Sequence, residues 1–108
     1  MNDKTTTIDE IRGFMRSFNA KRGWDKTQNA INIVMALSVE TAELMEIFQW
    51  LHSNEVSNIK NDYREYEHLQ EEIADVFWYL MELCDYFDVD LTTAVRDKGD
   101  KNAIKYPE

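Results

Sequence analysis

Two pairs of carboxylates with the same spacing are the residues of this sequence best suited to chemistry. Glu40 and Glu43 form one pair, and Glu72 and Asp75 form the other, each as acid-x-x-acid. On a helix, residues at i and i+3 lie on the same side, one turn apart. Two such carboxylates can reach one hard divalent cation, and Mg²⁺ and Mn²⁺ prefer oxygen ligands. The pairs predict a Mg²⁺ site, with Mn²⁺ as an alternative ion.

The position of these acids within their helices strengthens the prediction. Projected at about 100° per residue, Glu40 and Glu72 each fall in the middle of an apolar stripe, with Glu43 and Asp75 displaced to the same side. An ionised carboxylate in an apolar interior is costly unless it is compensated. No Lys or Arg lies near the acids on either stripe, so a metal ion is the expected compensation. The apolar residues around them are Ile33, Leu37, Leu44, Leu51, Leu69, Val76, Leu83 and Phe87.

The acids allow two other interpretations. In a non-catalytic helical interaction module, the acids would form only a solvated face. A di-iron carboxylate bundle would carry Glu-x-x-His on two helices, whereas Glu65-x-x-His68 is the one match here. Magnesium is therefore favoured over iron and zinc, and the solvated face remains the alternative.

Four helices are expected to position these acids. The sequence has three glycines and one proline, Pro107, so little interrupts a helix. Thr7 and Glu10 form a capping-box pattern, and Asp90 or Thr92 is a candidate cap for the last helix. The expected fold is all-α, a four-helix bundle-like protomer with helices over about 7–19, 29–51, 59–87 and 91–104.

Composition limits the function classes. The 108 residues suit a single domain over 1–108, and the formal charge is 12 − 21 = −9. Nucleic-acid binding is not expected, because it needs a basic face. Cys84 is the only cysteine, which excludes an intramolecular disulfide and a cysteine-based zinc site. No run reaches the ~20 apolar residues of a membrane span, and a cytoplasmic location is expected.

The aromatic residues of the third helix point to self-association. Phe77, Trp78 and Tyr79, followed by Tyr86 and Phe87, occupy several faces of the helix. A lone helix in a small bundle cannot bury them all, so a subunit interface is expected.

Residues 39–50 and 69–76 resemble the Glu-x-x-Glu…Glu-x-x-Asp signature of the all-α MazG-like NTP pyrophosphatases, most closely the dCTP pyrophosphatase branch. The resemblance covers nearly the whole chain. It includes residues 8–12, Trp24, Asn32 and the tail Lys98-x-x-x-Asn102-x-x-x-Tyr106-Pro107.

This resemblance implies hydrolysis of a nucleoside triphosphate to the monophosphate and pyrophosphate, in dNTP pool control or house-cleaning. The four acids would be catalytic residues and magnesium ligands. Independently of the resemblance, Glu43 is the candidate proton acceptor because it lies at the stripe edge. A homodimer, or a tetramer built from dimers, is also implied. The implied substrate-binding residues are Trp24, Asn32, Trp50, Tyr79, Lys98, Asn102 and Tyr106.

The sequence departs from the cytidine-preferring relatives at two places. They carry a histidine in the first helix and another in the loop, where this chain has Met15 and Gln28. The resemblance therefore leaves the base open, with dCTP as one candidate. A phosphoribosyl-ATP pyrophosphatase-like hydrolase on the same scaffold is the enzymatic alternative.

Overall fold

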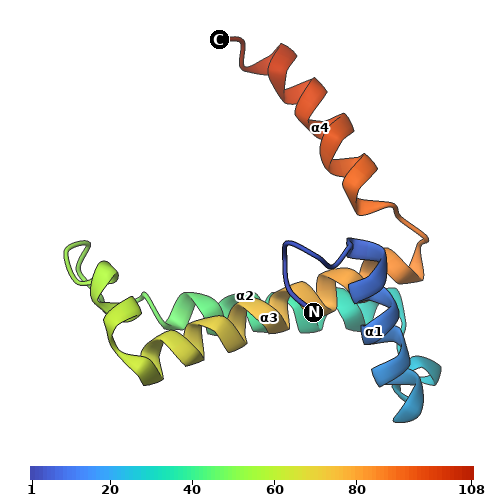
Figure 1. Cartoon of the computed structure of the whole chain (residues 1–108), viewed down its shortest axis with the longest axis horizontal. Helices are drawn as coiled ribbons and strands as arrows, with labels where there is room; N and C mark the ends of the chain where they lie inside the picture. The colour runs from blue at the N-terminus through green and yellow to red at the C-terminus, as the bar shows by residue number, and fades with distance from the viewer. The chain divides into compact units, whose positions relative to one another are not determined.

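The computed structural model describes residues 1–108 and contains helices as its only regular elements (Figure 1). The predicted all-α fold with four long helices is confirmed. None of the helices combines the length and apolar character that a membrane crossing would require. The elements are α1 (Ile8–Lys21), the 3₁₀ helix η1 (Trp24–Lys26), α2 (Ala30–Glu46), the 3₁₀ helix η2 (Val56–Asn61), α3 (Tyr63–Tyr86) and α4 (Leu91–Lys105).

Side-chain caps begin the helices, largely as the sequence predicts. The Thr7 hydroxyl accepts from the backbone N–H of Glu10, and the Glu10 carboxylate accepts from the N–H of Thr7, which completes the capping box. Asn29 caps α2, and Asp90 caps α4 by accepting from the N–H of Thr93. Each cap satisfies an N–H that the first helical turn leaves without a partner.

The connection between α2 and α3 is longer than predicted. α2 ends at Glu46 rather than near residue 51, and residues 47–50 form turns in which Phe48 N–H donates to the Met45 carbonyl. The apolar spacing continues through these residues, but it does not distinguish i+3 from i+4 bonding. α3 begins at Tyr63 rather than residue 59, because Asp62 accepts from the N–H groups of the next turn.

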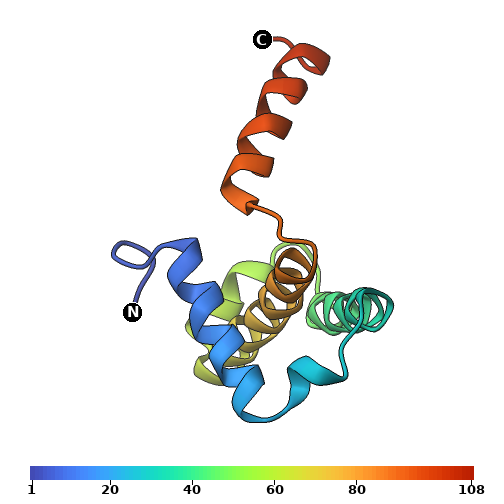
Figure 2. The same cartoon turned by 90° about the vertical axis from the view of Figure 1, so that its right-hand side faces the viewer.

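The helices divide into two compact units, residues 28–81 and residues 1–27 with 82–108. In the first of these, α2 lies antiparallel to the part of α3 before residue 82, as both views show (Figure 1, Figure 2). Its most buried apolar side chains are Ile33, Ile59 and Met81. This helix pair carries all four predicted acids.

In the other unit, ion pairs join α1 to the end of α3. Arg12 and Arg16 both contact the Asp85 carboxylate, Arg12 at 3.4 Å and Arg16 through two nitrogens. Arg12 also donates to the carbonyl oxygen of Val89 at 2.7 Å. Because Arg12 is only 11% exposed, this pairing is more protected than an ordinary surface ion pair.

The chain leaves α3 through a Schellman turn. Asp88 takes a left-handed conformation with φ 53°. The N–H of Val89 donates to the Cys84 carbonyl, and the N–H of Asp88 donates to the Asp85 carbonyl. This pattern satisfies the last carbonyls of the helix without glycine, since Asp tolerates the left-handed region better than most residues.

Acid should destabilise the fold through Asp85. Hydrogen bonding to Arg16, then its charge and the contacts with Arg12, hold the pKa of Asp85 below its ordinary 3.8 against the opposing effect of burial. The stabilisation is therefore present above about pH 4 and is lost as pH falls through the lower folded-state pKa. Asp85→Asn should lower the free energy of unfolding by about 1 kcal/mol at pH 7, since the group is partly screened by solvent.

Urea unfolding at pH 7 and pH 3 tests this expectation, with Asp97→Asn on exposed α4 as the matched control. The difference between wild type and Asp85→Asn should shrink at pH 3. An equal difference at both pH values would contradict the ion-pair assignment.

Candidate metal site

Three of the four predicted acids meet between α2 and α3. Glu40, Glu43 and Glu72 each offer a carboxylate oxygen, and these three atoms lie within 4.8 Å of one another. We call these three residues the acid cluster. Glu40 and Glu43 are one turn apart on α2, and Glu72 reaches them from the antiparallel α3.

No permanently charged basic side chain balances the negative charge of the acid cluster. The Oε2 atoms of Glu40 and Glu72 are buried and have no hydrogen-bond partner. No Lys or Arg forms an ion pair with any of the three acids, and the one basic neighbour is His68, whose Nε2 lies 3.3 Å from Oε1 of Glu72. Buried, unpaired carboxylate oxygens are what a hard divalent cation would bind.

Electrostatics agree with this geometry. Burial, followed by a hydrogen bond with Glu43 and the negative charges of Asp75, Glu43 and Glu72, raises the pKa of Glu40 to about 7. Burial and then the charge of Glu43 also raise the pKa of Glu72. Both shifts show that the cluster resists ionisation while it lacks a counter-charge. The donor set therefore fits a divalent ion such as Mg²⁺.

Asp75 lies close to the cluster without belonging to the group of three. It follows Glu72 by one turn on α3 and is exposed. Its negative charge contributes to the raised pKa of both Glu40 and Glu72. A role for Asp75 as a ligand remains a prediction.

Three other predicted residues belong to the same unit as the cluster. Asn32 is exposed in the first turn of α2, Trp50 is 85% exposed in the turn after α2, and Tyr79 is half-buried on α3. The exposure of Trp50 leaves its indole faces accessible, as a stacking residue requires.

Trp24 has a packing partner that the sequence did not indicate. Its ring meets Phe18 edge to face, with centroids 5.9 Å apart. The Arg22 guanidinium lies 3.4 Å from the centroid of the Phe18 ring and 6.0 Å from that of Trp24. Trp24 is nevertheless 48% exposed, so part of its surface is available to a ligand.

The predicted residues of the tail lie on or beside α4. Lys98 and Asn102 are exposed on the helix, and Tyr106 is 68% exposed at its end, with Lys105 Nζ 5.4 Å from its ring centroid. α4 contains no buried residue.

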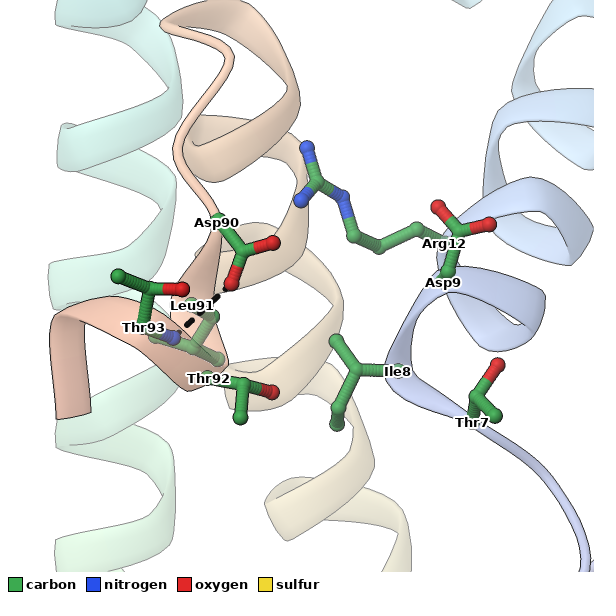
Figure 3. Close-up of a pocket in the computed structure, with 8 residues that line it drawn as sticks. All are labelled: Thr7, Ile8, Asp9, Arg12, Asp90, Leu91, Thr92 and Thr93. Carbon is green, nitrogen blue, oxygen red and sulfur yellow. Dashed lines mark hydrogen bonds between the residues drawn. The ribbon is translucent and has the colours of Figure 1, made fainter. Parts of the chain in front are cut away.

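A cavity of about 340 Å³ lies between the beginnings of α1 and α4, and none of the predicted catalytic, metal-binding or substrate-binding residues lines it (Figure 3). Asp9 and Asp90 contribute carboxylates to it, and Arg12, which also lines it, is already bound to Asp85 and Val89. Asp90 is engaged in capping α4. The acid cluster is thus the better candidate for chemistry.

Comparison with known proteins identifies the family to which this chain belongs. The model of the MazG-like family matches residues 35–108, which include the whole acid cluster. The chain belongs to the MazG-like family. The resemblance predicted from the acid signature is therefore confirmed.

Named relatives of this MazG-like chain come from animals and an archaeon. It is 39% identical to dCTP pyrophosphatase 1 of Homo sapiens and 38% identical to that of Bos taurus, each over 101 residues and 94% of this chain. The chain spans only 59% and 60% of those two proteins. A crystal structure of a pyrophosphatase from Archaeoglobus fulgidus matches with 36% identity and a TM-score of 0.86, covering 100% of this chain and 99% of that one.

Without metal, the MazG-like chain should lose stability as pH rises from about 4.5 through 7. The folded-state pKa of Glu40, about 7, lies above its ordinary 4.5, so deprotonation costs more in the folded state than in the unfolded state. Glu40→Gln should therefore be more stable than wild type at pH 8 and similar to it at pH 5. Urea unfolding in EDTA measures this, with the exposed Glu71→Gln as control. A destabilised Glu40→Gln at pH 8 would argue against a repulsive cluster.

Proposed function

We propose that this chain is a Mg²⁺-dependent pyrophosphohydrolase, which converts a (deoxy)nucleoside triphosphate and water to the monophosphate and pyrophosphate. One observation carries the proposal, namely the acid cluster of Glu40, Glu43 and Glu72 with buried oxygens that lack partners. The family match supports the reaction class, because the relatives bear the names dCTP pyrophosphatase and pyrophosphatase. Control or cleaning of the dNTP pool is the proposed role of residues 1–108, acting as one domain.

The chemistry follows from the charges. Bound divalent ions would polarise the α-phosphate and lower the pKa of the attacking water. Glu40, Glu43 and Glu72 would hold the ions, with Asp75 as a further ligand. The carboxylate of Glu43 interacts with both of the other acids, Glu40 and Glu72. We assign to Glu43 the acceptance of the proton from water.

The remaining predicted residues would contact the nucleotide. Lys98 and Asn102 are proposed for the phosphates, and the exposed rings of Trp24 and Trp50 for the base. The other proposed contacts are Asn32, Tyr79 and Tyr106.

dCTP is the first substrate to test because of the relatives' names. The position where cytidine-preferring relatives carry a histidine in the first helix is Met15, which is 5% exposed. An apolar side chain there offers no hydrogen bond to a base, so the base preference of this chain need not follow theirs.

We also propose that the working form is a homo-oligomer, a dimer or a dimer of dimers, with α2 in the interface. α2 is apolar over most of its surface, yet Ile33 is its only buried residue. A helix that is hydrophobic all round is normally buried. The exposed apolar side chains opposite Glu40 are Ile31, Val34, Met35 and Met45, and they are 72%, 46%, 63% and 62% exposed.

A turnover panel tests the proposed reaction. Wild type should release pyrophosphate from one or more of the common and modified dNTPs and NTPs in Mg²⁺, and none in EDTA. Glu40→Gln and Glu72→Gln should lower kcat/KM by about 100-fold or more, which corresponds to about 2.7 kcal/mol. Circular dichroism should show both variants folded, and Glu71→Gln should retain activity. Full activity in Glu40→Gln would refute the mechanism, and a chain that binds no Mg²⁺ would favour the interaction module.

Light scattering tests the interface. Met35→Glu places a charge in the exposed apolar surface of α2 and should shift the chain toward the monomer. Lys60→Glu, at an exposed position of η2, is a charge-changing control that should leave the mass unchanged. A wild-type monomer at tens of micromolar would disprove this part of the proposal.

A further inference from the structure

We infer that His68 is a positioning residue of the acid cluster, which holds one oxygen of Glu72 and leaves the other for the ion. The inference rests on the proposed function. The two residues are four apart on α3, a spacing that places side chains next to each other on a helix. His68 Nε2 lies 3.3 Å from Glu72 Oε1, while Glu72 Oε2 is buried without a partner.

The burial of the two side chains gives them different roles. His68 is 52% exposed, whereas Glu72 is 12% exposed. The imidazole therefore stands at the solvent edge of the cluster and contacts the carboxylate from outside. His68 is not among the residues whose ligand atoms lie within 4.8 Å of one another. Its geometry is that of a partner to a ligand.

A carboxylate in this position needs such a partner. The terminal torsion of a glutamate is broad, so the two oxygens exchange easily unless one is held. The charges of Glu43 and Asp75 also repel Glu72 when it is ionised. The contact of His68 Nε2 with Oε1, at 3.3 Å, opposes both effects and fixes which oxygen faces the ion. Groups that hold metal ligands from outside commonly change metal affinity when they are removed.

The acid-x-x-acid pattern alone does not show this role. Within the acid cluster, Glu40 and Glu43 have no basic partner, so His68 serves one of the three acids only. The single basic contact of the acid cluster therefore lies on α3, whereas α2 contributes the other two acids. Removing it should weaken ion binding while leaving the other acids in place.

The experiment compares two substitutions at the same position in the full chain. His68→Leu removes the donor, and His68→Gln keeps an N–H at a similar reach but cannot titrate. Mg²⁺ affinity is measured by calorimetry, and Mn²⁺ affinity by electron paramagnetic resonance, both without nucleotide. His68→Leu should weaken binding about tenfold, and His68→Gln should restore most of it. In turnover assays, the Mg²⁺ concentration for half-maximal rate should rise more than kcat falls.

The chain offers a matched control in its other histidine. His52 lies 4.0 Å from Glu55 Oε1 but is 86% exposed and is not part of the acid cluster. His52→Leu should bind Mg²⁺ like wild type, which separates loss of the His68–Glu72 contact from a general effect of replacing a histidine.

The outcomes separate this inference from the proposed function. If His68→Leu binds Mg²⁺ as tightly as wild type, or if His68→Gln binds as weakly as His68→Leu, His68 has no positioning role. In either case, loss of Mg²⁺ binding in Glu40→Gln would leave the proposed function intact. If wild type binds no Mg²⁺, both fail together. Unfolding curves for all variants show whether a lost affinity reflects a lost fold.

Discussion

Repulsion among carboxylates that lack a counter-charge is the constraint on which the rest of this structure depends. Glu40, Glu43 and Glu72 lie within a few ångströms of one another, and two of their oxygens are buried without a partner. Left to itself, such a group would separate into solvent or take up protons. Packing of α2 against α3 supplies the free energy that holds it together. The cluster is thus a site at which stability is given up for the capacity to bind a cation.

The same chain shows how a carboxylate is treated when its role is structural. Asp85 receives two arginines, and its pKa falls, whereas the pKa of Glu40 rises. Arg12 also binds the carbonyl of Val89, so it ties the turn after α3 to α1. Arginine side chains balance the negative charge of Asp85, whereas no Lys or Arg balances the negative charge of the acid cluster. The contrast indicates that the uncompensated acids are not a by-product of an acidic composition.

Sequence reasoning predicted the helices and the acids but not every boundary or partner. Apolar periodicity and the caps at Thr7 and Asp90 were sufficient to find the four helices. The end of α2 was missed because apolar spacing continues through residues 47–51 after the helical hydrogen bonds stop. Helical projection brought Glu40 and Glu43 to one side, but the meeting with Glu72 depends on how α2 and α3 pack. A pattern along one helix does not contain that information. The pattern included Asp75, whereas the group of three in the structure does not.

Charge also determines the order in which ions and substrate would bind in the proposed reaction. The chain carries a formal charge of −9, and a nucleoside triphosphate is itself an anion. The acid cluster would therefore repel the substrate until divalent ions reverse the local charge. The affinity for the metal ion would then determine the affinity for the substrate. His68, which we propose holds the Glu72 carboxylate, would affect both affinities. Base recognition, which we propose for the rings of Trp24 and Trp50, is a separate matter, because these uncharged side chains make no contribution to that charge balance. Selectivity for one nucleotide can for this reason change without any change in the acids or in the reaction.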